Sequence, residues 1–411
     1  MRLSDDVVLF NYAGIPMAGC LSTGAIIGLT PRGLSLCRQL QNADLRSAEI
    51  DDKDQVLIEH LSKGGFLDAP TPPRLQSAYL HITQRCNLEC AGCYSFSRER
   101  NSAIDASTAQ WKTAIKGISD AGAQKYIISG GEPFLRTDLY EITQYIKKVS
   151  PESEIIILSN GTLASYDNLL KIAPYADCVS ISFDGWSDKS EAAIRKTQRY
   201  SQLVAVVKHI NEIGLRAHII PTIHAKNYRD IPHYVELAER LGASLNFSLL
   251  TCASDDPAVS CLVPSDSELS DISNFLFRLK NNPSTTFAET PIGATLRARR
   301  NCGAGQKSIS IASDGTIYPC HMLHLKAFGM GNAFIDNVSE VLSSCSKSHI
   351  SQFEPDDNKE CSICEYKYLC GGGCRARSVI AHNNAADRDP YCALMKSFYQ
   401  CAEEDLKRAL K

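Results

Sequence analysis

The sequence lacks an excess of charge of either sign, a long apolar run and the start typical of a secreted protein. Its 43 Lys and Arg residues and 46 Asp and Glu residues give a formal net charge of −3. This near-neutral balance argues against binding to nucleic acid or to an anionic membrane that is mainly electrostatic. No apolar run reaches the ~20 residues that a membrane-spanning helix needs. Residues 1–6 lack the basic-then-apolar layout of a signal peptide. We therefore expect a soluble, cytoplasmic protein that binds neither nucleic acid nor membrane.

Cysteine, by contrast, is abundant, since the 411 residues include 17 cysteines. Disulfide scaffolds are short secreted chains, whereas a chain of this length has room for about two to four domains. In a reducing cytosol, clustered cysteines hold metal more often than they pair with each other. Thiolates suit zinc or iron–sulfur clusters, and the spacing of the cysteines has to decide between the two.

Residues 1–74 are predicted to form a small winged-helix-like domain. Val7–Phe10 and Ala25–Leu29 have the pattern of short strands, separated by a turn that contains glycine and proline. Thr30 and Pro31 have the cap and first-turn proline that begin a helix, and a second helix is predicted over Asp51–Lys63. The acidic start of the second helix argues against DNA binding. Asp68–Pro73 is predicted to be a stiff linker.

From residue 75 to residue 298 the chain alternates strand-like and helix-like segments. Amphipathic stretches long enough for helices, such as Thr108–Ala121 and Leu139–Val149, separate six apolar strand-like runs. These runs are 78–82, 125–128, 154–158, 178–182, 217–221 and 244–247. Repeated β–α units with mostly apolar strands predict an α/β fold, with a parallel sheet wrapped by helices as a full or partial barrel. In such folds the chemistry lies at the carboxyl ends of the strands.

Three cysteines follow the first of these strands on one loop. Cys86, Cys90 and Cys93 have the spacing CxxxCxxC. Three thiolates leave one iron of a four-iron cube open to a small molecule, whereas a fourth cysteine would make a closed electron carrier. A three-cysteine zinc site is the alternative interpretation.

The cysteine loop resembles that of the radical S-adenosylmethionine (radical SAM) superfamily. There the open iron binds SAM, and the reduced cluster cleaves SAM to a 5′-deoxyadenosyl radical that abstracts hydrogen from an unreactive C–H bond. The resemblance implies a (β/α)6 partial barrel over residues 75–298. Gly92 departs from the pattern, since many relatives carry an aromatic or larger residue beside the last cysteine.

Motifs after the next three strands strengthen this resemblance. Gly130, Gly131 and Glu132 belong to a Gly-Gly-Glu-Pro sequence like that of the superfamily, in which glycine lets the backbone approach a ligand closely. The resemblance implies that Glu132 accepts a hydrogen bond from the SAM amino group. It also assigns SAM contacts to the residues Ser159, Asn160, Ser182, Asp184 and Arg195. Of these, Ser182 and Asp184 would meet the ribose, and Arg195 the carboxylate. The later motifs also have an interpretation without ligand binding, in which Ser159–Asn160 belongs to a generic turn and Arg195 is a solvent-exposed helix residue.

The C-terminal segment, residues 299–411, carries a second cysteine pattern. Its seven spaced cysteines are Cys302, Cys320, Cys361, Cys364, Cys370, Cys374 and Cys392. This spacing resembles the SPASM domain of radical SAM enzymes that modify peptides and proteins. The resemblance implies two auxiliary [4Fe–4S] clusters, which make three clusters in all. One would be held by Cys361, Cys364, Cys370 and Cys392.

The other auxiliary cluster would be held by Cys302, Cys320 and Cys374. Relatives usually supply a fourth cysteine between the first two, but residues 303–319 contain none. Either a distant cysteine completes this cluster or its site is open. The candidates for a distant ligand are Cys252, Cys261 and Cys345.

The combined resemblance implies an enzyme that installs a thioether or carbon–carbon crosslink, or a related change, in a ribosomally made precursor peptide. Residues 1–74 would then resemble a RiPP recognition element, which binds the leader of the peptide by strand addition. A flavodoxin or ferredoxin would supply electrons.

Alternatives are a sulfatase-type formylglycine maturase, a tetrapyrrole side-chain modifier and, outside catalysis, an iron–sulfur electron carrier. Sulfatase-maturing relatives have an aspartate base where this chain has His321, which argues against that assignment. It also makes His321 the candidate catalytic residue.

Overall fold

The computed structural model describes residues 1–44, 51–67, 74–95, 97–251, 256–279, 296–345 and 349–410. The predicted linker 68–73 and Cys252 lie outside these ranges. No helix in the described part of the chain combines the length and apolar character that crossing a membrane requires.

The N-terminal module, residues 1–67, combines a three-stranded antiparallel sheet with two helices. Its elements are β1 (Val7–Tyr12), β2 (Ile15–Cys20), β3 (Ile26–Gly28), α1 (Pro31–Asn42) and α2 (Gln55–Lys63). The helix α1 begins as predicted, because the Thr30 hydroxyl accepts a hydrogen bond from the Gly33 N–H. The prediction of a simple turn between two strands was wrong. Ala13 and Gly14 both adopt positive φ and form a tight turn that leads into β2, the central strand.

The second sheet has ten strands, and its parallel part confirms the prediction of an α/β fold with a central parallel sheet. In sheet order the parallel strands are β10 (Ser248–Leu249), β8 (Arg216–Ile223), β7 (Cys178–Phe183), β6 (Glu154–Ser159), β5 (Lys125–Gly130) and β4 (Ser77–Thr83). The last predicted strand is divided into β9 (Ser244–Leu245) and β10, which both pair with β8. Beyond β4 the sheet continues with β11 (Ser308–Ile311), which is also parallel to β4, and then with the antiparallel strands β12 (Thr316–Tyr318) and β13 (Gly331–Asn332).

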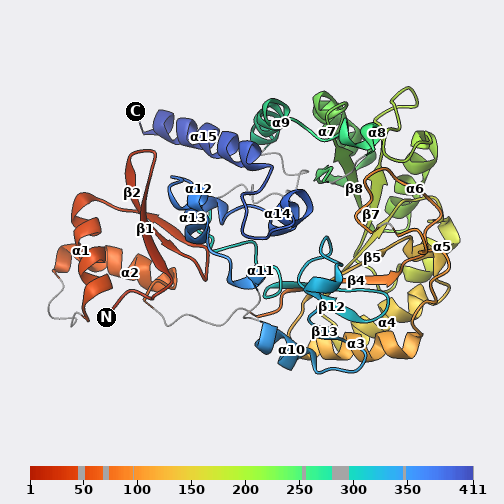
Figure 1. The fold of residues 1–411 in the computed structure, drawn as a ribbon, viewed down its shortest axis with the longest axis horizontal. Coiled ribbons are helices and arrows are strands. Elements are labelled where there is room, and N and C mark those ends of the chain that lie inside the picture. Colours follow the sequence, from red (N-terminus) through yellow and green to blue (C-terminus); the bar gives the residue numbers. More distant parts are fainter. Residues whose placement is uncertain are drawn as a thin grey trace.

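Helices cover the outer face of the parallel strands, as Figure 1 shows. They are α3 (Thr108–Asp120), α4 (Leu139–Val149), α5 (Tyr166–Ile172), α6 (Tyr200–Glu212) and α7 (Ile231–Leu241). The start of α3 is fixed by a capping box between Ser107 and Gln110. Leu80 and Ile82 of β4 are fully buried in the same core as Trp111 of α3. Because side chains alternate along a strand, Tyr79 and His81 face the inner side of the sheet.

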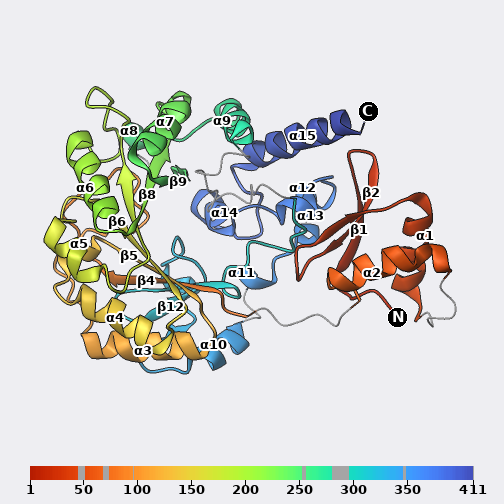
Figure 2. The ribbon, with the colours of Figure 1, turned by 180° about the vertical axis from the view of Figure 1, so that it is seen from behind.

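Beyond β13, most of the C-terminal segment lies between the N-terminal module and the parallel sheet, whereas its helix α10 packs beside α3 (Figures 1 and 2). Its helices are α10 (Val338–Cys345), α11 (His349–Gln352), α12 (Lys359–Ser362), α13 (Lys367–Cys370), α14 (Arg375–His382) and α15 (Cys392–Ala409). Two further helices, α8 (Pro257–Ser260) and α9 (Asp266–Arg278), follow the parallel strands, and Phe277 of α9 packs on Phe398 of α15. The N-terminal module is attached through β1. There the Tyr12 hydroxyl donates a 2.8 Å hydrogen bond to the carbonyl oxygen of Tyr399.

Candidate active site

Cys86, Cys90 and Cys93 lie together on the loop after β4, and their side chains are half-buried. Burial raises the pKa of the Cys90 thiol, and the nearby thiols of Cys93 and Cys86 raise it further. The three sulfurs are therefore within electrostatic range of one another. Three neighbouring thiols suit an iron–sulfur centre, whose positive iron ions favour the thiolate form that the protein surroundings disfavour.

Protein contacts fix the shape of this loop. The backbone N–H of Cys86 donates to the Asn101 side-chain oxygen at 2.9 Å, and Ala91 N–H donates to the Ile194 carbonyl at 2.8 Å. The buried guanidinium of Arg100 donates to a carbonyl of the same loop. Protein contacts thus fix the loop and tie it to the segment that contains Arg195.

Gly130 and Gly131 lie where the end of β5 passes the cysteine loop. A Cβ atom on Gly130 would lie 2.2 Å from the Thr83 carbonyl oxygen, and one on Gly131 would lie 2.0 Å from the Arg85 carbonyl oxygen. Backbone hydrogen bonds from Gly131 to Thr83 and from Glu132 to Arg85 hold the two segments at this short distance. The sequence suggested that glycine serves contact with a ligand, but here glycine is required by contact with the protein backbone itself.

Glu132 is completely buried at the end of β5. Its carboxylate accepts hydrogen bonds from Phe134 N–H at 3.1 Å, the Ser159 hydroxyl at 2.9 Å and Asn160 N–H at 2.8 Å. Burial raises the pKa of Glu132 to about 7, and the three hydrogen bonds act against that rise. Glu132 therefore joins the ends of β5 and β6 from inside the protein.

Asn160 also links β6 to the cysteine loop. Its side-chain amide donates to the Asn87 side-chain oxygen at 3.0 Å and approaches the Cys86 sulfur at 3.9 Å. Asn87 in turn donates to the Thr162 hydroxyl at 2.8 Å. The structure thus brings three of the sequence motifs into one hydrogen-bonded group at the carboxyl ends of β4, β5 and β6.

Arg195 is positioned by Asp184, which follows β7. One Asp184 carboxylate oxygen accepts from the backbone N–H groups of Ile194 and Arg195, at 3.0 and 2.6 Å. The Nε and Nη1 atoms of Arg195 are buried and have no hydrogen-bonding partner. Two unpaired guanidinium nitrogens beside the cysteine loop fit the carboxylate of a ligand such as SAM. Ser182, on β7, is half-buried close to this group in the chain.

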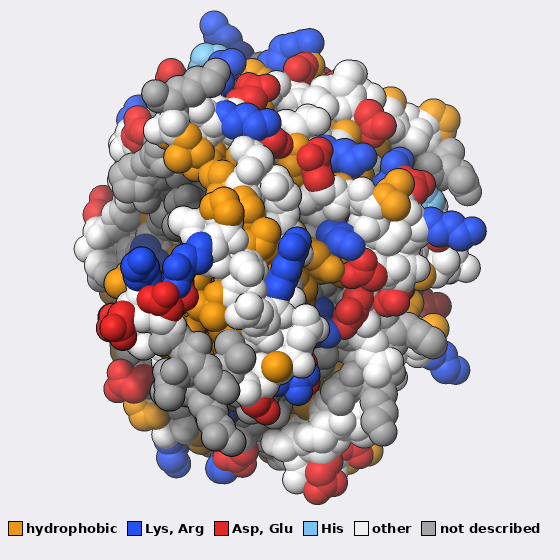
Figure 3. Space-filling model, turned by 90° about the vertical axis from the view of Figure 1, so that its left-hand side faces the viewer, with side chains coloured by type: hydrophobic (Ala, Val, Ile, Leu, Met, Phe, Trp, Pro, Cys, Tyr) orange, Lys and Arg blue, Asp and Glu red, His pale blue; other side chains and the backbone are white. Residues whose placement is uncertain are grey.

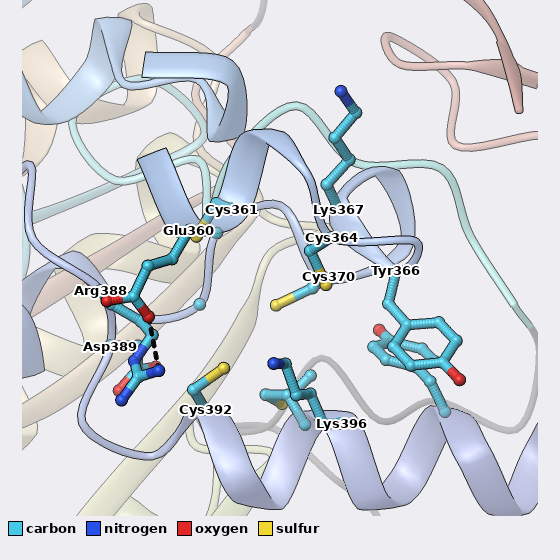
Figure 4. A pocket seen from close by; sticks show the side chains of 14 residues that line it. Glu360, Cys361, Cys364, Tyr366, Lys367, Cys370, Arg388, Asp389, Cys392 and Lys396 are labelled. Atoms are coloured by element: carbon cyan, nitrogen blue, oxygen red, sulfur yellow. Dashed lines mark hydrogen bonds and ion pairs between the residues drawn. The ribbon is translucent and has the colours of Figure 1, made fainter. Parts of the chain in front are cut away.

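The second cysteine pattern forms a cavity between α12 and α15 (Figure 4). Cys361, Cys364, Cys370 and Cys392 all line it, as the resemblance implies for one auxiliary cluster. Burial raises the pKa of Cys370 to about 12, and Asp389 and the other three thiols add to the rise. Four thiols that line one cavity match, in kind and number, the donor set of a [4Fe–4S] cluster.

Three consecutive glycines let the chain pass from this cavity to the next cysteine, Cys374. Gly371, Gly372 and Gly373 have φ angles of +67°, +81° and +75°, a region that residues with a Cβ rarely occupy. A Cβ on Gly373 would lie 2.5 Å from an Asp389 carboxylate oxygen. Asp389 is buried, accepts from Cys374 N–H at 2.7 Å and forms a buried ion pair with the guanidinium of Arg377.

Cys302, Cys320 and Cys374 approach one another on the other side of this turn. Burial raises the pKa of Cys374, and the thiol of Cys302 contributes to the rise. Cys320 and Cys374 pack against the same small apolar cluster. Of the proposed distant ligands, Cys261 is exposed and its thiol donates to the Ala258 carbonyl. For Cys345 only the place at the end of α10 is described.

The candidate catalytic residue His321 lies among aromatic rings at the inner face of the sheet. Its ring stacks on Tyr79, with centroids 4.3 Å apart, and contacts Tyr94 at 5.3 Å. Burial and the neighbouring His324 lower the pKa of His321 to about 4. The imidazole is therefore neutral at physiological pH.

Sequence reasoning missed two buried histidines near these groups. His224 directly follows β8, and its Nε2 atom is buried without a hydrogen-bonding partner. His81 lies on the inner face of β4, and its Nε2 atom is likewise unpaired. The rule that directed attention to strand ends would have found His224, and the period-two alternation along β4 would have found His81.

Comparisons with known proteins identify the two parts of the chain that carry these cysteine patterns. Residues 80–238 match the radical SAM superfamily, and residues 302–365 match the SPASM iron–sulfur cluster-binding domain. The PqqA peptide cyclase of Bradyrhizobium diazoefficiens is 26% identical over 337 residues, which cover 77% of this chain and 85% of that protein. The AdoMet-dependent heme synthase of Methanosarcina barkeri is 25% identical over 338 residues, which cover 76% and 94%.

A solved structure shares the fold over nearly the whole chain. Streptococcus suis SuiB bound to precursor peptide SuiA matches with a TM-score of 0.63 at 16% identity, covering 95% of this chain and 99% of that one. The match therefore includes residues on both sides of the region that aligns with the superfamily.

Proposed function

The chain carries a radical SAM domain followed by a SPASM iron–sulfur domain, and from this premise we propose that it modifies a ribosomally made precursor peptide. The modification is a thioether or carbon–carbon crosslink, or a related change. When bound at this site, SAM and a reduced iron–sulfur cluster would supply the radical chemistry that removes a hydrogen atom from the peptide. The observation that carries the proposal is the convergence of the cysteine loop, Glu132, Asn160 and Arg195 at one end of the parallel strands.

In this proposal the thiols of Cys86, Cys90 and Cys93 hold the catalytic cluster. The unpaired guanidinium of Arg195 binds the SAM carboxylate, and Asp184 holds the Arg195 backbone in place. Glu132 is assigned to the SAM amino group. The hydrogen bonds that Glu132 accepts from Ser159 and Asn160 also give it a structural role, because they fix the loops that would surround SAM. Further SAM contacts come from Gly130, Gly131, Ser159, Asn160 and Ser182.

Two auxiliary clusters complete the proposed set of three. Cys361, Cys364, Cys370 and Cys392 fully ligate one, which is supported by the cavity that they share. The set of Cys302, Cys320 and Cys374 ligates the other. A flavodoxin or ferredoxin is the proposed electron donor, because a one-electron step at the catalytic cluster requires an external reductant.

The proposed domains are a winged-helix-like recognition element over residues 1–74, a partial barrel over 75–298 and a SPASM domain over 299–411. Among the residues that the structure describes, the edge strand β3 pairs with β2 alone, so its other side can accept an extended leader peptide. Figure 3 shows a band of hydrophobic side chains on this end of the molecule, with Lys and Arg beside it. Val56 of α2, 65% exposed, supplies apolar surface in the same module.

A heme-modifying activity is the second candidate, because one relative is an AdoMet-dependent heme synthase. The N-terminal module favours the peptide substrate, since the match to SuiB with its bound peptide covers 95% of this chain. A formylglycine maturase and a simple electron carrier have less support. An electron carrier binds no carboxylate ligand, so the unpaired Arg195 nitrogens beside the cysteine loop argue against it.

The test is reductive SAM cleavage by the cluster-loaded protein, followed by mass spectrometry of the precursor peptide encoded beside its gene. We expect 5′-deoxyadenosine under dithionite and a mass change in the peptide that depends on SAM. A protein that binds no SAM would contradict the enzymatic proposal. Cleavage that modifies a tetrapyrrole and leaves the peptide unchanged would favour the second candidate.

A further inference from the structure

Four rings gather on the inner face of β4, and two of them belong to cysteine-bearing segments. Tyr79 stacks on His321 at a centroid distance of 4.3 Å, and Tyr94 meets His321 at 5.3 Å with an interplanar angle of 77°. His81 lies 6.0 Å from Tyr94. We call these four residues the ring platform.

The ring platform connects both proposed cluster sites through the chain itself. Tyr94 directly follows Cys93 of the catalytic loop, and His321 directly follows Cys320 of the auxiliary set. Tyr94 is 44% exposed, although the neighbouring inner face of β4 is largely buried. A peptide side chain that contacts Tyr94 is therefore held directly beside the catalytic loop and within reach of the auxiliary set.

The side chains packed around the ring platform are aromatic rings and hydroxyl groups. Burial lowers the pKa of His81 well below its ordinary value, and His324 and His321 lower it further. The Tyr94 hydroxyl contacts the Ser129 hydroxyl at 3.3 Å, and His324, which lies behind His81, contacts the Ser310 hydroxyl at 2.8 Å. A charged side chain placed on these rings would lose part of its hydration, a cost that an uncharged ring does not bear.

One polar atom of the ring platform has no partner. His81 is only 3% exposed, and its Nε2 atom makes no hydrogen bond. Buried polar atoms are nearly always hydrogen-bonded in folded proteins. This nitrogen is therefore the atom of the ring platform that a ligand hydroxyl can satisfy, while the surrounding rings favour an aromatic partner.

We propose that the ring platform holds the side chain of the peptide residue that is modified, and that it selects an uncharged aromatic side chain bearing a hydroxyl group. This inference rests on the proposed function and names the class of residue on which the enzyme acts. In this assignment Tyr94 supplies the contact surface, and His81 supplies the hydrogen bond that distinguishes a hydroxylated ring from a plain one.

The test measures binding of four small probes to the cluster-loaded holoenzyme with SAM, by saturation-transfer difference NMR of the probes. The probes are p-cresol, toluene, n-butylamine and butyrate, which represent a phenol, a plain ring, a cation and an anion. We expect p-cresol to bind best, toluene more weakly, and the two charged probes at least about fivefold more weakly than p-cresol. Binding of either charged probe as tightly as p-cresol would overturn the proposal.

Substitutions place the binding on the ring platform. Tyr94→Leu should weaken p-cresol binding about fivefold. The matched control is Tyr166→Leu on α5, because Tyr166 is 42% exposed and meets His209 at 5.4 Å in the same T-shaped arrangement. His81→Phe should abolish the advantage of p-cresol over toluene, and His81→Gln, which retains hydrogen-bonding capacity, should keep part of it. Unchanged p-cresol binding in Tyr94→Leu would refute the ring platform.

The probes bind without turnover, so this experiment separates the two proposals. Absence of SAM cleavage together with normal probe binding would refute the proposed function alone. Normal SAM cleavage together with probe binding that ignores both Tyr94→Leu and His81→Phe would refute the ring platform alone.

Discussion

The Glu132 carboxylate accepts a 2.8 Å hydrogen bond from the backbone N–H of Asn160. Through this bond the carboxyl ends of β5 and β6 are held together, and the Asn160 side chain extends the connection to Asn87 on the cysteine loop. A single buried carboxylate thus fixes the relative positions of three loops. Its protonation should be visible in the stability of the protein.

Glu132 should make the protein less stable as the pH rises from about 4.5 to about 7. Its pKa is raised from 4.5 to about 7 by burial, so the folded state binds the proton more tightly than the unfolded state does. Stability is therefore greatest below the unfolded pKa and falls through this window, by about 2–3 kcal/mol. Urea unfolding of the apoprotein at pH 5 and pH 8 measures this fall, which Glu132→Gln should remove.

Glu154→Gln is the control for that experiment. Glu154 lies on the neighbouring strand β6, and despite a desolvation effect its pKa is lowered by hydrogen bonds from Lys125 and Arg216. Its removal should leave the fall between pH 5 and pH 8 in place. A Glu132→Gln variant with the same pH dependence as the wild type would show that Glu132 titrates normally in the folded protein.

Replacing Cys86, Cys90 and Cys93 together with alanine should abolish formation of 5′-deoxyadenosine. Iron content should fall by about one cluster of four irons, because the four-thiol cavity around Cys370 is separate from this loop. Cys178→Ala is the control, since Cys178 is buried on β7 and belongs to neither pattern. Continued SAM cleavage by the triple variant under dithionite would contradict the assignment of the catalytic cluster.

Gly28→Pro should weaken binding of the leader peptide while leaving SAM cleavage intact. Residue pairs in an antiparallel ladder alternate between hydrogen-bonded and non-hydrogen-bonded pairs. The backbone hydrogen bonds from Cys20 to Ala25 and from Leu29 to Pro16 show which pairs are bonded. The pair of Met17 and Gly28 is therefore non-bonded, and the Gly28 N–H points away from β2. Proline removes that outward N–H and blocks strand addition at the edge. Fluorescence anisotropy of a labelled leader peptide measures the loss.

Gly28→Ala is the matched control for the leader experiment. A Cβ at this position would make only ordinary contacts, at 3.7 Å from Ile15 and from Met17, and the N–H is kept. The alanine variant should therefore bind the leader like the wild type. Equal binding by the proline and alanine variants would remove β3 as the docking edge.

The auxiliary cluster at Cys302, Cys320 and Cys374 should respond to a cysteine in the peptide. If these three cysteines are the only protein ligands, one iron would be open to a substrate thiol, which a metal ion deprotonates readily. Electron paramagnetic resonance spectra of the variant without the catalytic cluster should change when a cysteine-bearing peptide is added, and not when its cysteine is replaced by serine. An unchanged spectrum, together with loss of the signal in a Cys252, Cys261 or Cys345 variant, would identify a distant fourth ligand instead.

Much of the fold could be predicted because its elements carry local signals. The bounds of α4 follow from apolar periodicity, and the start of α1 follows from Thr30 and Pro31. The strand β2 was missed because Gly14 and Pro16 resemble turn residues. Pro16 is tolerated at the point where β3 ends, so its missing N–H removes only the last bond of the ladder.

The site was predictable as a set of strand-end motifs, but its internal contacts were not. The need for glycine at Gly131 depends on the Arg85 carbonyl, which belongs to a distant segment of the chain. The unpaired nitrogens of Arg195 depend on Asp184 holding its backbone. Such contacts are set by tertiary packing, and a single sequence carries no local signal for them.

The contact of Tyr12 with the last helix determines how this protein can be recombined with its relatives. Tyr12 packs on Tyr366 and bonds to the carbonyl oxygen of Tyr399, and these two tyrosines also line the four-thiol cavity. A chimera that exchanges only the first 74 residues would place a foreign strand against the wall of a cluster cavity. If the N-terminal module selects the peptide as proposed, a chimera has to keep the partners of Tyr12 on Tyr366 and Tyr399 together with that module.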